Sequence, residues 1–89
     1  MTALISVSPN PFADVVHIRI EYENKKSTHY IVWLIDDKGK IVKMSGVTLE
    51  AGVTIIELDR LQGLPAGTFR LDIKDTEGKS IYSAGMVKE

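Results

Sequence analysis

The residue types that most often carry chemistry are few and scattered in this sequence. The two histidines, His17 and His29, have no cysteine, histidine or carboxylate at a spacing typical of metal ligands. The chain contains no cysteine, and no serine lies in a nucleophile-elbow sequence, so nothing indicates nucleophilic catalysis. We therefore predict that both histidines are solvated surface residues, that the protein is not an enzyme, and that it holds no metal or cofactor.

Carboxylates are concentrated in two similar segments, which read Asp36-Asp37-Lys38-Gly39-Lys40 and Asp75-Thr76-Glu77-Gly78-Lys79. Their acidic side chains would form a calcium site if both segments lay at one end of the fold, although neither has the ligand spacing of a calcium loop. Asp also favours the first position of a turn, and glycine favours the left-handed region. We favour this second interpretation, in which each segment is a type I turn followed by a left-handed glycine.

These residues are carried by short stretches in which apolar and polar side chains alternate, the pattern of a β-strand with one buried face. Residues 14–23 and 69–73 alternate cleanly, whereas residues 28–35 are apolar on both faces. We expect the inward side chains of these stretches to be Val16, Ile18, Ile20, Tyr22, Tyr30, Val32, Leu34, Phe69, Leu71 and Ile73. Shorter runs at 4–7, 41–44, 53–58 and 79–87 bring the total to about seven strands, without a helical period. The sequence therefore predicts an all-β, immunoglobulin-like antiparallel β-sandwich.

Prolines and glycines define the corners between these strands. Pro65 fixes its own φ at about −65°, so Leu64-Pro65-Ala66-Gly67 predicts a tight corner with Gly67 at positive φ. Pro9-Asn10-Pro11 lacks two backbone donors, and we expect it to form a kinked crossover between the sheets that Phe12 closes as a buried anchor. The first and last strands are predicted to be open edges.

Composition limits the classes to which the protein can belong. The 89 residues suit one small domain, of which 44% is hydrophobic and 26% charged. The 11 basic and 12 acidic residues give a net charge of −1, which excludes a basic field for nucleic acid or an anionic membrane. The longest apolar run, residues 30–35, is too short to span a bilayer, and the start of the chain does not read as a signal peptide. We expect either a cytoplasmic protein or a single-domain fragment of a larger exported chain.

Four segments, in order along nearly the whole chain, resemble the motifs of one known family. Val7-Ser8-Pro9-Asn10-Pro11-Phe12 resembles a YPNPF opening, and residues 34–42 resemble a central I-Y-D-x-x-G-R-x-V segment. Residues 52–73 resemble G-x-N-x-I-x-L-D-x-x-x-L-P-A-G-x-Y-x-L-x-I, and residues 85–89 resemble a short basic terminal motif. Each match is weak by itself, but the ordered set is specific. It resembles the C-terminal sorting domains of the type IX secretion system.

The resemblance implies a compact β-sandwich at the extreme C-terminus of a large protein exported by Bacteroidetes-type bacteria. Such a domain, here residues 1–89, is a non-catalytic signal that an outer-membrane translocon recognises and a sortase-like peptidase then removes. The cargo, N-terminal to the domain, crosses the periplasm and reaches the cell surface or the exterior. The motif residues that match by position are Pro9, Asn10, Pro11, Gly39, Leu64, Pro65, Ala66, Gly67 and Lys88. The prolines and glycines among them also have architectural reasons to be present, and both roles stay open.

A binding module is the main alternative to a sorting signal. In that interpretation Ile31 and Trp33 lie on an outward strand face, where they contact glycan or protein. We favour a Trp33 that is packed in the core or covered by a neighbouring side chain over an open binding surface. A weaker third interpretation is a structural cap similar to the immunoglobulin-like part of flagellar hook-cap proteins. None of the three involves nucleic acid, and the sorting interpretation involves no small-molecule substrate.

Overall fold

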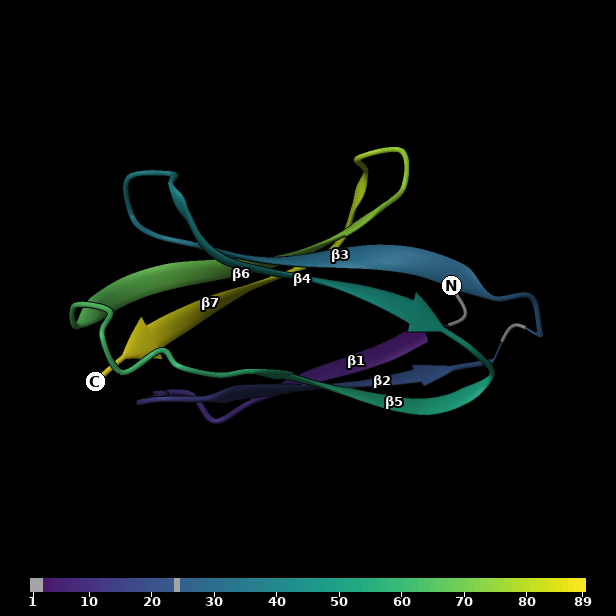
Figure 1. Cartoon of the computed structure of the whole chain (residues 1–89), viewed down its shortest axis with the longest axis horizontal. Helices are drawn as coiled ribbons and strands as arrows, with labels where there is room; N and C mark the ends of the chain where they lie inside the picture. Colours follow the sequence, from purple (N-terminus) through teal and green to yellow (C-terminus); the bar gives the residue numbers. More distant parts are fainter. Residues whose placement is uncertain (1–2, 24) are drawn as a thin grey trace.

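The computed structural model describes residues 3–23 and 25–89 as two antiparallel β-sheets that face each other (Figure 1). The strands are β1 (Ala3–Ser8), β2 (Val16–Tyr22), β3 (Thr28–Ile35), β4 (Ile41–Leu49), β5 (Gly52–Leu58), β6 (Gly67–Asp75) and β7 (Ser80–Lys88). One sheet has the order β1-β2-β5 and the other the order β4-β3-β6-β7. These strands, and the absence of a helix among the described residues, confirm the predicted β-sandwich.

The alternation of side chains determines which face of each strand is buried. In β2, Val16, Ile18 and Ile20 are fully buried, whereas Arg19 between them is exposed. In β3 and β6 the inward side chains are also the predicted ones, and all but the half-buried Tyr30 are buried: Val32, Leu34, Phe69, Leu71 and Ile73. The period-2 pattern thus predicted the phase of the three strands that contribute most to the core.

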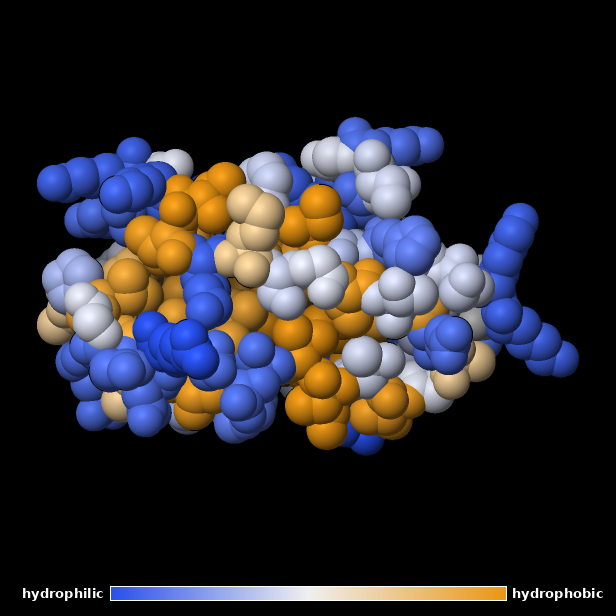
Figure 2. Space-filling model, in the orientation of Figure 1, coloured by the Kyte–Doolittle hydropathy of each residue, from blue (hydrophilic) through white to orange (hydrophobic). Residues whose placement is uncertain are grey.

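The core is closed by three residues that the alternation did not indicate. Leu49 ends β4, Leu61 lies in the connection between β5 and β6, and Met86 lies in β7; each is at most 2% exposed. Figure 2 shows hydrophobic residues in orange along the middle of one face and hydrophilic residues in blue over the projecting turns. The burial of Leu61 means that the β5–β6 connection is packed against the sandwich.

The turn between β3 and β4 has the predicted chemistry. Asp36 Oδ1 accepts hydrogen bonds from the backbone N–H groups of Lys38 at 2.9 Å and Lys40 at 2.8 Å. The Gly39 N–H donates to the Asp36 carbonyl at 3.1 Å, and Gly39 has a φ of 86°. The carboxylate therefore stabilises the turn through its backbone, and the glycine supplies the left-handed residue.

The turn between β6 and β7 repeats this arrangement around Asp75. Its Oδ1 accepts from the N–H groups of Glu77 and Lys79 at 3.0 and 2.9 Å, and Gly78 has a φ of 82°. The two turns lie at opposite ends of β3, because β3 leads directly into the first turn whereas Tyr30 near its start pairs with Asp75 (Figure 1). The calcium-site hypothesis is therefore wrong. The described residues contain no group of three or more His, Asp or Glu that could hold a metal ion.

Two strand details differ from the prediction. β4 continues to Leu49 instead of ending at Met44, because its second half pairs with the start of β3 as far as Thr28. Ile35 stays on the predicted outer face, opposite Arg70 of β6, but is only 5% exposed. A register shift against β4 between Leu34 and Ile35 places it opposite Ile41. Both features depend on the neighbouring strand and leave no local pattern in the sequence.

The strands at the sheet edges are β1 and β5 in one sheet and β4 and β7 in the other. The predicted edge positions of the first and last strands are therefore confirmed. Within residues 3–23 and 25–89 there is no helix of the length and apolarity needed to span a membrane.

Candidate functional site

Several connections of the sandwich meet at one end, which we call the motif end (Figure 1). It contains the loop at residues 9–15, the turn at residues 36–40 and the corner at residues 59–66. The start of β6 and the final residues of β7 also lie there, because β1, β3, β5 and β7 all run toward this end. All the motif residues that match the family by position therefore lie at one end of the molecule.

The loop at residues 9–15 reaches across to the free edge of β7 in the other sheet. Asn10 makes this contact with both ends of its amide: Nδ2 donates to the Gly85 carbonyl at 3.1 Å, and Oδ1 accepts from the Val87 N–H at 2.9 Å. Pro9 and Pro11 are exposed on either side of it, and each follows a cis peptide bond. The Asn10 side chain thus binds two residues of β7 that lie 75 and 77 positions after it in the sequence.

Phe12 continues the contact with its backbone. Its N–H donates to the Val87 carbonyl at 2.8 Å, and its carbonyl accepts from the Glu89 N–H at 2.9 Å. These bonds form a short parallel bridge beside Lys88. The Phe12 ring is fully buried and meets the Phe69 ring edge to face, with the centroids 5.9 Å apart. Phe12 is therefore the buried anchor that the sequence predicted.

The predicted crossover between the sheets is wrong in its connectivity. β1 and β2 pair with each other, from Ala3 with Tyr22 to Ser8 with His17, so loop 9–15 returns the chain to its own sheet. The loop bridges the two sheets through hydrogen bonds to β7 and through the ring contact of Phe12 with Phe69. The prolines indicated an irregular segment, but its partner is β7, at the opposite end of the sequence.

The corner before β6 is attached to the same loop. The Leu61 N–H donates to the Asp14 carbonyl at 3.0 Å, and the Leu61 carbonyl accepts from the Leu64 N–H at 3.0 Å. Leu64 is half-buried, whereas Pro65 and Ala66 are exposed. The corner therefore packs its two leucines, Leu61 and Leu64, toward the sandwich and presents Pro65 and Ala66 to solvent.

Gly67 and Lys88 meet where β6 begins and β7 ends. Gly67 has a φ of 150°, which confirms the predicted positive φ, and it pairs with Lys88. Lys88 is only 8% exposed, and its ammonium donates to the Glu89 carbonyl at 2.9 Å. The basic residue of the terminal motif is thus held against the sandwich, and its role in recognition stays a prediction.

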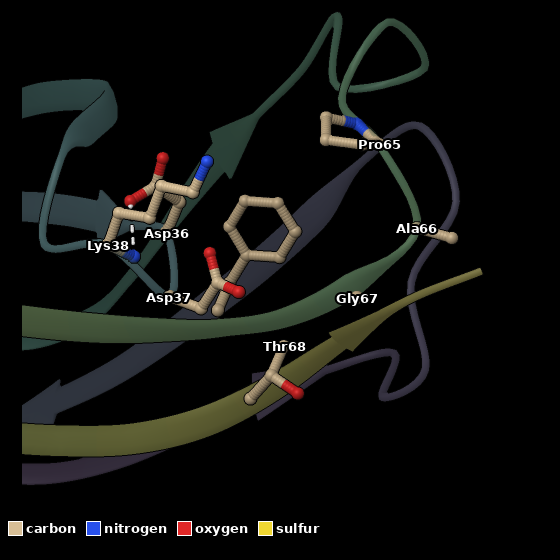
Figure 3. Close-up of a pocket in the computed structure, with 8 residues that line it drawn as sticks. Asp36, Asp37, Lys38, Pro65, Ala66, Gly67 and Thr68 are labelled. Atoms are coloured by element: carbon tan, nitrogen blue, oxygen red, sulfur yellow. Dashed lines mark hydrogen bonds between the residues drawn. The ribbon is translucent and has the colours of Figure 1, made fainter.

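A cavity of about 290 Å³ lies between the β3–β4 turn and the corner (Figure 3). Asp36, Asp37 and Lys38 line one side, and residues 65–69 line the other. The dashed line in Figure 3 is the hydrogen bond that Asp36 accepts from Lys38, so this carboxylate is engaged within the turn. Two of the motif segments, residues 34–42 and 52–73, therefore lie on opposite sides of this cavity.

Ile31 and Trp33 lie away from the motif end, in the middle of β3 on the outer face of the four-stranded sheet. The Trp33 ring is half-buried, and the Lys74 ammonium lies 5.1 Å from its centroid. Trp33 Nε1 is buried and has no hydrogen-bond partner among the described residues. Ile31 is 37% exposed, and Met44, which pairs with Trp33, is 58% exposed. Trp33 is therefore neither a core residue nor an open stacking surface, because a neighbouring side chain covers it.

Both histidines lie on outer faces, as predicted. His17 Nε2 lies 3.0 Å from Glu57 Oε2, and His29 Nδ1 lies 2.9 Å from Thr48 Oγ1. Each pair joins neighbouring strands of one sheet. These contacts give the two side chains a structural role on the surface.

Tyr30 lies near the opposite end of the sandwich, where β3 pairs with the end of β6. Burial raises the pKa of its phenol above the ordinary value of 10.0, and the charges of Tyr22 and Asp75 raise this pKa further. The raised pKa of Tyr30 therefore reflects the packing of that end of the sandwich and not the motif end.

Sequence reasoning missed the contacts that join the motif segments. Four residues outside the predicted site residues bind partners in another segment: Asp14, Leu61, Gly85 and Val87. The sequence contains one signal, at Asn10. Pro9 and Pro11 on either side of it have no backbone N–H, so the Asn10 side-chain amide is a donor that this segment can offer to another part of the chain. Its partners could not be inferred, because no local pattern connects the two ends of the chain.

Solved structures with a similar fold include parts of two β-glucosidases. The β-glucosidase from Listeria innocua in complex with isofagomine has a TM-score of 0.62 and 14% identity, over 97% of this chain and 16% of that one. A β-glucosidase from Kluyveromyces marxianus has a TM-score of 0.56 and 15% identity, over 99% of this chain and 14% of that one. At such identity the likeness shows the fold alone. No curated protein matches the sequence.

The family comparison covers nearly the whole chain. A family described as "Secretion system C-terminal sorting domain" matches residues 6–88, from β1 to the last residue of β7. The matched range includes each segment that meets at the motif end, from the Asn10 loop to Lys88. The chain therefore belongs to the family of C-terminal sorting domains of the type IX secretion system, and its role is that of a secretion-sorting signal.

Proposed function

We propose that residues 1–89 form a single, non-catalytic sorting domain at the C-terminal end of a larger exported protein, and that this domain directs its cargo across the outer membrane. The cargo passes through the periplasm and ends at the cell surface or outside the cell. The partners are the outer-membrane translocon, a sortase-like peptidase that removes the domain, and the cargo N-terminal to it. No cofactor, small-molecule substrate or nucleic acid takes part.

The observation that carries this proposal is the convergence of the motif segments at one end of the sandwich. Asn10 contacts the last strand, the corner contacts the Asn10 loop through Leu61 and Asp14, and Gly67 pairs with Lys88. Topology alone places alternate connections at one end, but here every motif position lies at that end and the segments also bind one another. Their proximity supports a single surface that a partner contacts.

The motif residues divide by exposure into two proposed roles. The exposed residues, Pro9, Pro11, Pro65 and Ala66, are available to contact the translocon. Gly39 and Gly67 set backbone conformations, and the half-buried Leu64 and buried Lys88 support the surface from within. Asn10 is exposed, but its side chain is bound to β7.

The binding-module hypothesis has one observation in its favour. Ile31, at 37% exposure, and Met44, at 58%, form an exposed apolar strip beside Trp33 that suits contact with another protein. Glycan stacking has less support, because the Lys74 ammonium covers the Trp33 ring. This strip lies apart from the motif residues, so the two functions are separable by mutation.

A reporter fusion tests the sorting function. Residues 1–89 are joined to the C-terminus of a periplasmic reporter in a host with a working type IX system. We expect the reporter to reach the cell surface or the medium, and to stay in the periplasm when the translocon is disabled. Retention of this fusion, while a known sorting domain exports the same reporter, would sink the proposal.

Two exposed alanines provide a matched pair for the contact surface. Ala66 lies in the corner of the motif end, and Ala51 lies in the corner between β4 and β5 at the opposite end. We expect Ala66→Glu to reduce export of the fusion several-fold and Ala51→Glu to leave it unchanged, with both domains folded. Equal export by the two variants would show that the motif end is not the contact surface.

A further inference from the structure

The free edge of β7 is occupied at its end by another part of the chain. An edge strand exposes the N–H and C=O groups of every second residue, which invites pairing with a further strand. At the motif end, loop 9–15 binds four such groups: the Gly85 carbonyl, the N–H and carbonyl of Val87, and the Glu89 N–H. The last residues of the chain are therefore held between β6 on one side and this loop on the other.

Asn10 supplies half of this contact with one side chain. Its carboxamide uses one N–H as donor and its oxygen as acceptor, so it takes the place of the N–H and C=O that one residue of an adjoining strand would present. Phe12 supplies the other half with its own backbone. Pro9 and Pro11 carry no N–H, so the loop offers no donor at either position to which another strand could pair.

The two halves of the contact differ in how they are anchored. Phe12 is fully buried against Phe69, whereas Asn10 is exposed and held only through its amide. Loss of the Asn10 amide therefore leaves the core and the Phe12 anchor in place. It would release the Gly85 carbonyl and the Val87 N–H from the loop, without unfolding the sandwich.

We infer that Asn10 is a positioning residue that holds the end of β7 against loop 9–15, and that the secretion machinery binds this closed form. The second part rests on the proposed function. The bound surface then consists of two chain segments that meet only in the folded domain, so an unfolded domain does not present it. Binding of the last residues as a released, extended strand would instead require the Asn10 contact to break.

Hydrogen exchange and export of the Asn10→Ala variant test the two parts. In the 89-residue domain we expect the Val87 N–H to exchange at least tenfold faster, and the N–H groups of β6 to keep their rates. In the reporter fusion we expect several-fold lower export. Asn10→Asp keeps the acceptor for Val87 and loses the donor to Gly85, so its effects should be intermediate. Ser27→Ala removes an exposed hydroxyl from the connection between β2 and β3 at the opposite end, and should change neither measurement.

Each other outcome has a distinct meaning. Unchanged exchange at Val87 overturns the positioning role, as does faster exchange throughout β6, which would mean that the loop supports the whole fold. Faster Val87 exchange with equal or greater export overturns the closed form as the bound state, while the sorting function stands. Retention of the unsubstituted fusion refutes the proposed function and the second part of the inference together, and the exchange rates still decide the first part.

Discussion

At Gly67 the backbone is unusual but the surrounding space is empty. Its φ of 150° lies in a region that is essentially restricted to glycine, yet a Cβ added there would meet no atom within 4 Å. A larger side chain would therefore act on the backbone conformation alone. The position therefore separates conformational strain from steric clash.

We expect Gly67→Val to lower the free energy of unfolding by about 1–3 kcal/mol, because valine must adopt this conformation or displace the start of β6. Gly46→Val is the matched control: Gly46 lies in β4, has equally open space and does not have a positive φ. Valine suits an exposed strand position, so no loss is expected there. Urea denaturation measures both, and equal losses would contradict the conformational argument.

β6 is an inner strand of the four-stranded sheet, and its inward face is buried. It lies between β3 and β7, and Phe69, Leu71 and Ile73 all point into the core. The corner before it is attached to loop 9–15 by the hydrogen bond from the Leu61 N–H to the Asp14 carbonyl. Its first residue, Gly67, pairs with Lys88, the last residue of β7. The strand therefore connects the core to the motif end.

Leu71→Ala should lower the free energy of unfolding by about 2–5 kcal/mol, because the side chain is fully buried and a cavity would remain. Leu4→Ala removes the same atoms from β1, where the side chain is 69% exposed, and should cost less than about 0.5 kcal/mol. Chemical denaturation of the two variants gives the comparison. A small effect at Leu71 would mean that the inward face of β6 is misassigned.

The elements differ in how far the sequence could predict them. β2, β3 and β6 alternate over enough residues to fix their inward faces, and the Asp-x-x-Gly turns carry their own chemistry. β4 could not be bounded, because Ser45 and Gly46 interrupt its pattern and only pairing with β3 extends it to Leu49. The burial of Ile35 on the outer face likewise accompanies a register shift against β4. Each failure concerns a feature that a neighbouring strand determines.

For the site, the sequence predicted the motif residues but not their assembly. Pro9, Asn10, Gly67 and Lys88 were all identified from the order of short segments. That Asn10 binds β7, and that Leu61 binds the same loop, could not be predicted. A hydrogen bond between loop 9–15 and the last strand has no periodicity for a local pattern to detect.

The whole molecule has two ends with nearly the same turn chemistry but different surroundings. The turn at Asp36 borders the corner at residues 65–69, whereas the turn at Asp75 lies at the opposite end, beside Tyr30 (Figure 1). Each carboxylate accepts two backbone hydrogen bonds of similar length. The turn at Asp75 is therefore a matched control for substitutions in the turn at Asp36 of the motif end.

Asp36→Ala and Asp75→Ala should each lower the free energy of unfolding by about 1–2 kcal/mol, because each removes the acceptor of two backbone N–H groups. Only Asp36→Ala should reduce export of the reporter fusion, since only that turn borders the motif residues. Thermal denaturation and the fraction of reporter outside the cell are the two measurements. Equal loss of export would indicate that stability, and not the motif end, controls secretion.

The direction of the first strand has a mechanical consequence. β1 begins at Ala3, which pairs with Tyr22 at the end of the sandwich opposite the motif end, and the molecule measures 39 Å along its longest axis. A cargo joined ahead of Ala3 therefore stands beyond the far end, separated from the motif end by the length of the strands. Under the proposed function, we therefore expect the domain to act as a spacer, so that the machinery can bind the motif end whatever the shape of the protein attached to the other end.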